Sequence, residues 1–199
     1  MNARSLRILL LSAAFLAGLM VCLGLIVLVT GRWSAPVAQQ VAAIGGPFKL
    51  VDHHGREVTE QDFKGRPFLV FFGFTHCPDV CPTALFEISE ILRLLGRDAE
   101  RTRALFITVD PERDTPAVMK DYLSSFDPRL IGLTGDATAV AAVAKAYRVY
   151  YKKVPLDQGG YTMDHTAIVY LMDKQGRFVS PFSLKRTTEA AAADLRKHL

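Results

Sequence analysis

A nearly continuous apolar run leads directly into two cysteines, and this junction limits the folds that the chain can adopt. Residues Pro67 to Phe74 (PFLVFFGF) have the composition of a strand buried on both faces. The cysteines follow in residues 73–82 (GFTHCPDVCP), and Pro82 to Leu95 carry apolar side chains at helical spacing. A strand that ends at a dithiol and continues as a helix predicts an α/β fold with its ligand site at the strand end.

Strand and helix patterns alternate along the rest of the domain. We expect a hairpin of residues 48–51 and 57–59, strands at 104–109 and 130–133, a second hairpin of 168–172 and 178–182, and helices at 115–126, 136–147 and 188–199. This order predicts an α/β sandwich with a central mixed sheet over residues 47–199. The dithiol at the junction of the first long strand and helix narrows the plan to a thioredoxin-like fold.

The first thirty residues have a different character. No charged residue occurs from Ile8 to Thr30, and 23 helical residues would extend about 34 Å, enough to cross a hydrocarbon core of roughly 30 Å. Arg4 and Arg7 precede the run, which keeps that end cytoplasmic under the positive-inside rule. The sequence therefore predicts that residues 1–31 form a cytoplasmic N-terminus and a single transmembrane helix. Residues 32–46 would form a tether.

A cleaved signal peptide is the alternative for this segment, although such peptides have apolar stretches of only about 7–15 residues. Val37, Ala38 and the Ala42-Ala43 pair nevertheless leave a cleavage site possible. A lipoprotein anchor at Cys22 is disfavoured because Val21 is bulky for the position before it. Only seven residues precede the apolar run, too few for a mitochondrial transit peptide. We therefore expect a bacterial inner membrane protein, single-pass, with its C-terminal domain in the periplasm.

The basic net charge of +4 does not indicate a nucleic-acid partner. Three arginines lie in residues 1–32, so residues 33–199 carry 21 basic and 20 acidic groups. No Lys/Arg cluster alternates with aromatic residues, and nucleic-acid binding is therefore not expected.

The two cysteines of residues 73–82 are suited to both redox and metal chemistry. If the turn is helical, the Cα atoms of Cys77 and Cys81 lie about 6 Å apart, which allows a disulfide or a shared metal ion. Pro82 fits the first helical position, so Cys81 would lie at a helix N-terminus, where the helix dipole favours the thiolate.

Two thiolates alone rarely complete a metal site, so one of the five histidines is expected to supply a third ligand. His165 is the candidate, because it comes immediately before the strand expected at 168–172. His53 and His54 lie in a polar hairpin turn, His198 is the penultimate residue, and His76 would point away from Cys77 in a continued strand.

Three segments in this order resemble the signatures of the Sco/SenC copper proteins: GFTHCPDVCPTAL, DPERDTP at residues 110–116 and YTMDHTA at residues 161–167. The resemblance covers about residues 44–198, and the N-terminal anchor also matches. It implies that Cys77, Cys81 and His165 bind Cu(I) or Cu(II). The chemistry agrees, because two soft thiolates and one imidazole suit copper, whereas zinc would normally require a fourth ligand.

Four acidic residues around these motifs are candidates for supporting roles. Asp79 lies between the cysteines, and Asp164 precedes the histidine, which it could orient. The resemblance places the loop with Asp110 and Asp114 near the metal, where either residue could tune copper or meet a partner. A thioether ligand from Met163 is less expected than a packing role.

Two functions of different classes remain open. The resemblance implies a copper metallochaperone that delivers copper to the dinuclear copper centre of cytochrome c oxidase subunit II, with other periplasmic copper chaperones or thiol reductants as further partners. The alternative is an enzyme, a membrane-anchored thiol–disulfide oxidoreductase that reduces the acceptor's cysteines through Cys77 and Cys81. A metal site requires His165, whereas a reductase does not. A peroxidase is disfavoured because Thr75 lies only two residues before Cys77.

Overall fold

The structure, a computed structural model, describes residues 3–33 and 44–199 and divides into two compact units, Met1–Val41 and Ala42–Leu199. In the first unit, α1 (Ala3–Trp33) is one helix whose segment Leu10–Leu28 is long and apolar enough to cross a membrane. The expected apolar helix is thus present, and its role as a membrane anchor stays a prediction. Most of the predicted tether, and the small residues that keep cleavage open, lie outside the described residues.

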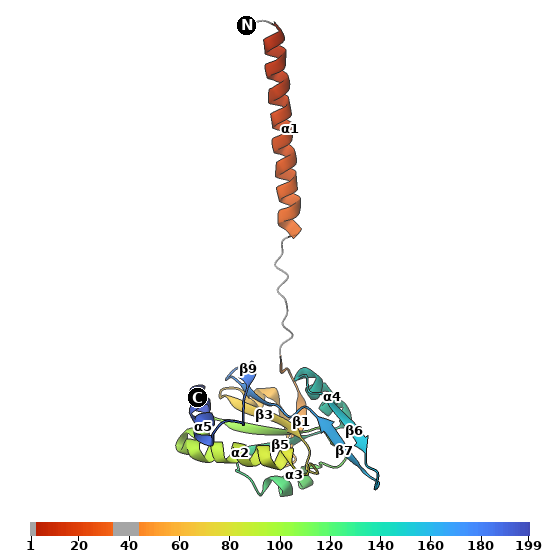
Figure 1. Cartoon of the computed structure of the whole chain (residues 1–199), viewed down its shortest axis with the longest axis vertical. Helices are drawn as coiled ribbons and strands as arrows, with labels where there is room; N and C mark the ends of the chain where they lie inside the picture. Colours follow the sequence, from red (N-terminus) through yellow and green to blue (C-terminus); the bar gives the residue numbers. More distant parts are fainter. Residues whose placement is uncertain (1–2, 34–43) are drawn as a thin grey trace. The chain divides into compact units, whose positions relative to one another are not determined.

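A seven-stranded mixed sheet forms the centre of the second unit, with the strand order β2-β1-β5-β4-β3-β8-β9 (Figure 1). Strand β3 pairs in parallel with β4, and β4 with β5, while the other neighbours are antiparallel. The strands are β1 (Lys49–Asp52), β2 (Glu57–Thr59), β3 (Phe68–Gly73), β4 (Arg103–Thr108), β5 (Leu130–Thr134), β8 (Val169–Met172) and β9 (Phe178–Pro181).

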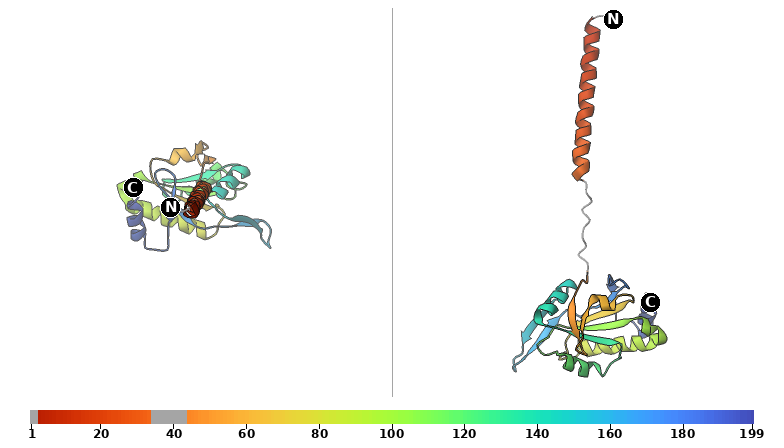
Figure 2. Two further views of the ribbon diagram at one scale, coloured as in Figure 1. Left: turned by 90° about the horizontal axis from the view of Figure 1, so that it is seen from above. Right: turned by 180° about the vertical axis from the view of Figure 1, so that it is seen from behind.

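Helices cover both faces of this sheet. Figures 1 and 2 show α2, α3 and α5 on one face and α4 on the other. The helices are α2 (Val80–Leu95), α3 (Pro116–Leu123), α4 (Ala137–Ala146) and α5 (Thr188–Arg196), with short 3-10 turns η1 (Glu60–Phe63) and η2 (Gly96–Arg101). Thr115 and Asp136 cap α3 and α4 through their side chains. The result is the expected thioredoxin-like sandwich.

Strand β3 lies in the middle of the core, and all six of its residues are buried. Phe71 stacks on Phe106 of β4 with ring centroids 6.1 Å apart, on the face that α2 covers. Phe72 points to the opposite face and meets Tyr147, at a centroid distance of 5.4 Å, and Tyr170. Burial on both faces explains the continuous apolar run of β3. The same packing fixes the position of the strand end that leads into the cysteines.

A second, two-stranded sheet formed by β6 (Tyr151–Pro155) and β7 (Tyr161–His165) was not expected. It is a hairpin between α4 and β8, visible beside the main sheet in Figure 1. His165 therefore ends a strand of its own instead of merely preceding β8. The expected start of α2 at Pro82 was also wrong, because the helix begins two residues earlier, at Val80.

Candidate metal centre

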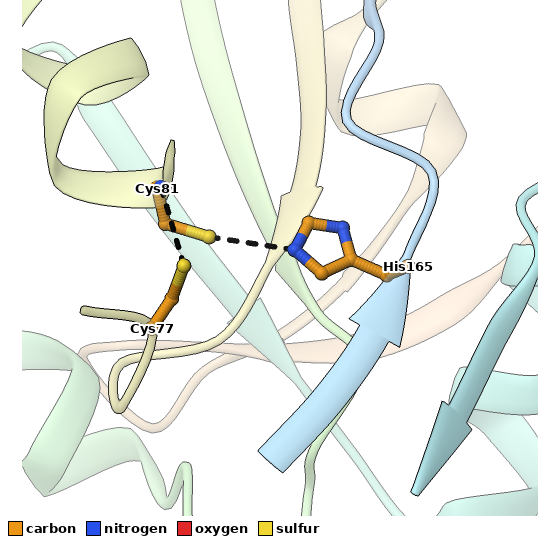
Figure 3. Close-up of side chains that lie close together, drawn as sticks. All are labelled: Cys77, Cys81 and His165. Atoms are coloured by element: carbon orange, nitrogen blue, oxygen red, sulfur yellow. Dashed lines mark hydrogen bonds between the residues drawn. The ribbon is translucent and has the colours of Figure 1, made fainter. Parts of the chain in front are cut away.

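Cys77 lies in the turn after β3, three residues before α2 begins, and Cys81 lies in the first turn of α2. The Cys77 N–H donates to the carbonyl of Phe74 at 3.2 Å, which closes a turn directly after β3. The Cys81 N–H, in the first turn of the helix, donates to the sulfur of Cys77 at 3.4 Å. These two bonds fold the segment back on itself, so both thiols face the same side of the strand end (Figure 3).

The sulfur of Cys81 occupies space that a glycine leaves open. Cys81 is fully buried, and a Cβ atom built at Gly73 would lie 2.6 Å from its Sγ atom and 2.7 Å from the Phe106 ring. No other residue at position 73 leaves this space free. Gly73 is a functional position that we did not single out from the sequence, because its role depends on a contact with α2.

His165 reaches the cysteines from the end of β7. Its Nδ1 atom lies 3.1 Å from the backbone carbonyl of Thr166. Because a carbonyl only accepts hydrogen bonds, Nδ1 carries the proton and Nε2 keeps its lone pair. This Nε2 atom faces Cys81 Sγ at 3.6 Å, as Figure 3 shows. The rings of Phe74 and Phe71 pack against the imidazole in T-shaped arrangements, at centroid distances of 5.8 and 6.4 Å.

The two sulfurs and one ring nitrogen form a compact set of ligand atoms. Cys77, Cys81 and His165 each offer one atom, and all three atoms lie within 4.8 Å of one another. Within the described parts of the chain, no other group of three or more His, Cys, Asp or Glu residues has a suitable arrangement for a metal ion. The other histidines lie elsewhere: the ring of His53, for example, accepts the N–H of Gly132.

Burial affects the protonation of Cys81 and His165. It raises the pKa of the Cys81 thiol far above its usual value, and the neighbouring Cys77 and Asp114 act in the same direction. The expectation that the helix N-terminus would favour a Cys81 thiolate was therefore wrong, because burial of the sulfur favours the neutral thiol. Burial also lowers the pKa of His165, which keeps its imidazole neutral and its Nε2 available to a metal. A metal ion would have to displace the proton of Cys81.

Comparisons with known proteins agree with this geometry. The family model described as SCO1/SenC matches residues 36–199. The chain belongs to the SCO1/SenC family. It is 43% identical over 166 residues to the mitochondrial SCO2 homolog of Bos taurus, in an alignment that covers 81% of this chain and 62% of that protein. The chain spans about three fifths of the length of the mitochondrial relatives from cattle, mouse and zebrafish.

Two solved structures of SCO1/SenC proteins with bound copper share the fold. Bradyrhizobium japonicum ScoI is 66% identical with a TM-score of 0.77, over 79% of this chain and 100% of that one. Yeast Sco1 is 38% identical with a TM-score of 0.72, over 78% of this chain and 88% of that one. Copper is thus the metal that these relatives carry, and Cys77, Cys81 and His165 form a potential metal-binding group in this SCO1/SenC chain.

The four candidate acidic residues of this SCO1/SenC site fall into two classes. Asp110 and Asp114 are buried, with 2% and 0% of their surfaces exposed, so they act from inside the molecule. Asp79 and Asp164 are exposed, and both line an open groove beside Cys77 and His165. The charge of Asp164 opposes the effect of burial on the pKa of His165. The supporting roles of Asp79 and Asp164 remain predictions.

Proposed function

We propose that the chain is a copper metallochaperone that holds one copper ion through Cys77, Cys81 and His165. The observation that carries this proposal is the set of two sulfurs and one imidazole nitrogen within 4.8 Å of one another. Thiolate and imidazole ligands suit copper, and especially Cu(I), which accepts a low coordination number. Zinc would normally require a fourth ligand, and the group found among the described residues offers three.

The position of the site supports transfer of the ion to another protein. Cys81 is fully buried, whereas Cys77 is half-buried and lines the open groove with His165. A partner can therefore approach Cys77 and His165 first and add its own ligands before Cys81 releases the ion. Val80, with half of its surface exposed, also lines this groove and offers apolar contact.

The acceptor that we propose is the dinuclear copper centre of cytochrome c oxidase subunit II. Two observations support it: membership of the SCO1/SenC family, since the solved protein BsSco is described as a member of the Sco family of cytochrome c oxidase assembly proteins, and the apolar helix that could keep the domain beside a membrane-bound oxidase. We further propose that α1 lies in a bacterial inner membrane and that residues 47–199 face the periplasm, where other copper chaperones or thiol reductants would supply copper or electrons.

A metal count on the full chain in detergent micelles tests the proposal. The reduced protein is loaded with Cu(I), and bound copper is measured in wild type and in Cys77→Ser, Cys81→Ser and His165→Ala. His76→Ala is the matched control, because His76 is exposed and close to Cys77 but does not belong to the ligand group. We expect one copper per chain in wild type and in the control, and weaker binding in the other three. Wild-type affinity in His165→Ala would disprove the three-ligand site.

Thiol–disulfide exchange is the second candidate function, and the unequal exposure of the cysteines favours it. Half-buried Cys77 would attack a disulfide of the acceptor, forming a mixed disulfide and releasing one acceptor thiol. Buried Cys81 would then attack Cys77, leaving a Cys77–Cys81 disulfide and a fully reduced acceptor. A reductase assay on His165→Ala separates the functions. Loss of copper binding with full reductase activity would show that the two depend on different residues.

A further inference from the structure

The three proposed ligands come from two separate parts of the fold. Cys77 and Cys81 follow β3 of the main sheet, whereas His165 ends β7 of the two-stranded sheet. The pairing within each sheet therefore does not fix the distance between the imidazole and the sulfurs. Other contacts must set it, and residues 110–114 make contacts with both parts.

On one side, Asp114 holds the segment that leads to Cys77. Its buried carboxylate accepts hydrogen bonds from the N–H of Thr75 at 3.0 Å and from the Thr75 hydroxyl at 2.6 Å. The hydroxyl of Thr108, at the end of β4, donates to the same carboxylate at 2.6 Å. Three donors satisfy Asp114 without a cation, so the segment is tied to the end of β4.

On the other side, Arg113 and Asp110 hold the hairpin. The Tyr161 hydroxyl donates to Asp110 Oδ1 at 3.0 Å, and Arg113 Nη1 donates to the backbone carbonyl of Tyr161 at 3.0 Å. The guanidinium of Arg113 also forms an ion pair with Asp110 and lies over the Tyr161 ring, 3.9 Å from its centroid. Lys153 approaches the same ring at 4.2 Å, and its ammonium pairs with Glu112 at 2.7 Å. That last pair is exposed and contributes little.

Tyr161 and His165 are the two ends of β7. The end with His165 is tied to the chain before β6, because the Thr166 N–H donates to the carbonyl of Tyr150 at 2.9 Å. The contacts of Tyr161 fix the other end. These contacts restrain both ends of β7, and they therefore restrain the position of the imidazole relative to the sulfurs.

We infer that residues 110–114 form a brace that sets the distance between His165 and the cysteines, with Tyr161 and Arg113 as positioning residues for the histidine ligand. The role of the brace in copper binding rests on the proposed function. The contacts that form the brace do not, because they are present without copper. It also gives the buried carboxylates of Asp110 and Asp114 a role in holding structure.

Tyr161→Phe tests the brace, because it removes the hydroxyl that bonds Asp110 and keeps the ring beneath Arg113. Tyr150→Phe is the matched control, since Tyr150 is exposed and adjoins the same hairpin. The first measurement is on the full chain without copper, in detergent micelles, with NMR labels on histidine and cysteine. We expect the nuclear Overhauser effect between the His165 ring and Cys81 to weaken in Tyr161→Phe and to persist in Tyr150→Phe. An unchanged effect in Tyr161→Phe would overturn the brace.

The second measurement is Cu(I) affinity in a double-mutant cycle. Removing a group that orients a metal ligand typically weakens metal binding about 10- to 100-fold, and we expect a loss of about tenfold for Tyr161→Phe. In the His165→Ala background the same change should have no effect, because no imidazole remains to be positioned. An equal loss in both backgrounds would show a general structural effect and would overturn the inference.

Arg113→Lys provides a second variant. Lysine keeps a positive charge near Asp110 but lacks the planar fork that also reaches the Tyr161 carbonyl. We expect the same weakening in both measurements. If the wild-type chain binds no copper, the proposed function fails, and the measurement without copper alone decides whether the brace exists.

Discussion

At the scale of single residues, Gly73 has the most specific steric role. A methyl group there would lie 2.6 Å from Cys81 Sγ and 2.7 Å from the Phe106 ring, and both groups lie in a packed core, where any movement costs free energy. We predict that Gly73→Ala lowers the free energy of unfolding by about 1–3 kcal/mol and weakens Cu(I) binding, because the sulfur must move. Far-UV circular dichroism during urea unfolding and a Cu(I) competition titration measure the two effects.

Gly46→Ala is the control for that substitution. The nearest atom to a Cβ at Gly46 is Ala146 Cβ at 3.4 Å, an ordinary contact, so stability and copper binding should change little. Copper binding by Gly73→Ala at the wild-type affinity would show that the sulfur does not depend on the space at this position.

His53 gives the domain a pH-dependent contribution to stability. Its Nδ1 atom accepts the N–H of Gly132 at 3.0 Å, which requires a neutral ring. Burial, aided by the neighbouring charge of His54, lowers the pKa of His53. Because the pKa of His53 is lower in the folded state than in the unfolded state, the folded state favours the neutral ring. The stability that this ring contributes is fully present above the unfolded pKa of about 6.5 and is lost as pH falls through the folded pKa. We therefore predict that stability falls on acidification, by at most about 1.4 kcal/mol per pH unit for this group.

The His53→Asn variant isolates this effect, because asparagine places an oxygen acceptor where Nδ1 lies but does not titrate in this range. His165, whose pKa is also lowered, contributes equally to both proteins. Unfolding midpoints measured from pH 7.5 to pH 5 should fall more steeply in wild type than in His53→Asn. Parallel curves would contradict the prediction.

At the scale of elements, the turn after β3 depends on the hydroxyl of Thr75. Thr75→Val preserves the shape of the side chain but removes its 2.6 Å hydrogen bond to the buried carboxylate of Asp114. We predict a loss of about 1.5–3 kcal/mol in the free energy of unfolding, the usual range for a hydrogen bond to a charged group. Thr83→Val is the comparison, because Thr83 is exposed and its hydroxyl lies 3.5 Å from Asp79. Equal losses in the two variants, measured by urea unfolding, would argue against a special role for Thr75.

Elements with a strong apolar pattern could be predicted from the sequence, whereas the hairpin β6–β7 could not. Strand β3 is buried on both faces and reads as a continuous apolar run, so it was found within one residue at each end. Strand β6 has no buried residue, and its sequence YKKVP shows no apolar face. Gly159-Gly160, both with positive φ, was the available signal for a turn between two short strands.

The ligands of the candidate site could be predicted from the sequence, whereas most of the groups that position them could not. Its ligand types and spacing could be recognised as motifs, so Cys77, Cys81 and His165 were identified and the structure brings them together. Among the groups that position them, Asp110 and Asp114 were recognised as candidates through the family resemblance, but others were not. The space at Gly73 and the Thr166 carbonyl belong to the three-dimensional arrangement, and a backbone carbonyl has no signature in sequence. The start of α2 was misplaced because Pro82 is also compatible with the third helical position.

At the scale of the whole molecule, the two compact units differ in where their apolar side chains lie: the second unit buries them in a core, and the first exposes them. The core cluster, from Phe48 to Leu199 with Ile44 packed against it, lies entirely in the second unit. The described side chains of α1 from Leu10 to Leu28 are all exposed and almost all apolar, far more apolar surface than a soluble protein normally presents to water.

We therefore predict that a fragment of residues 44–199 is soluble and folds alone, with the thermal midpoint and copper stoichiometry of the second unit in the full chain. The full chain should sediment with membranes and require detergent for release, because an exposed span of 19 residues, almost all of them apolar, partitions strongly into lipid. Mass spectrometry of the membrane fraction distinguishes an anchor from a cleaved signal, since an anchor leaves the N-terminal residues in place. A soluble product that begins within residues 34–43 would contradict the anchor, and an unfolded 44–199 fragment would contradict the independence of the second unit.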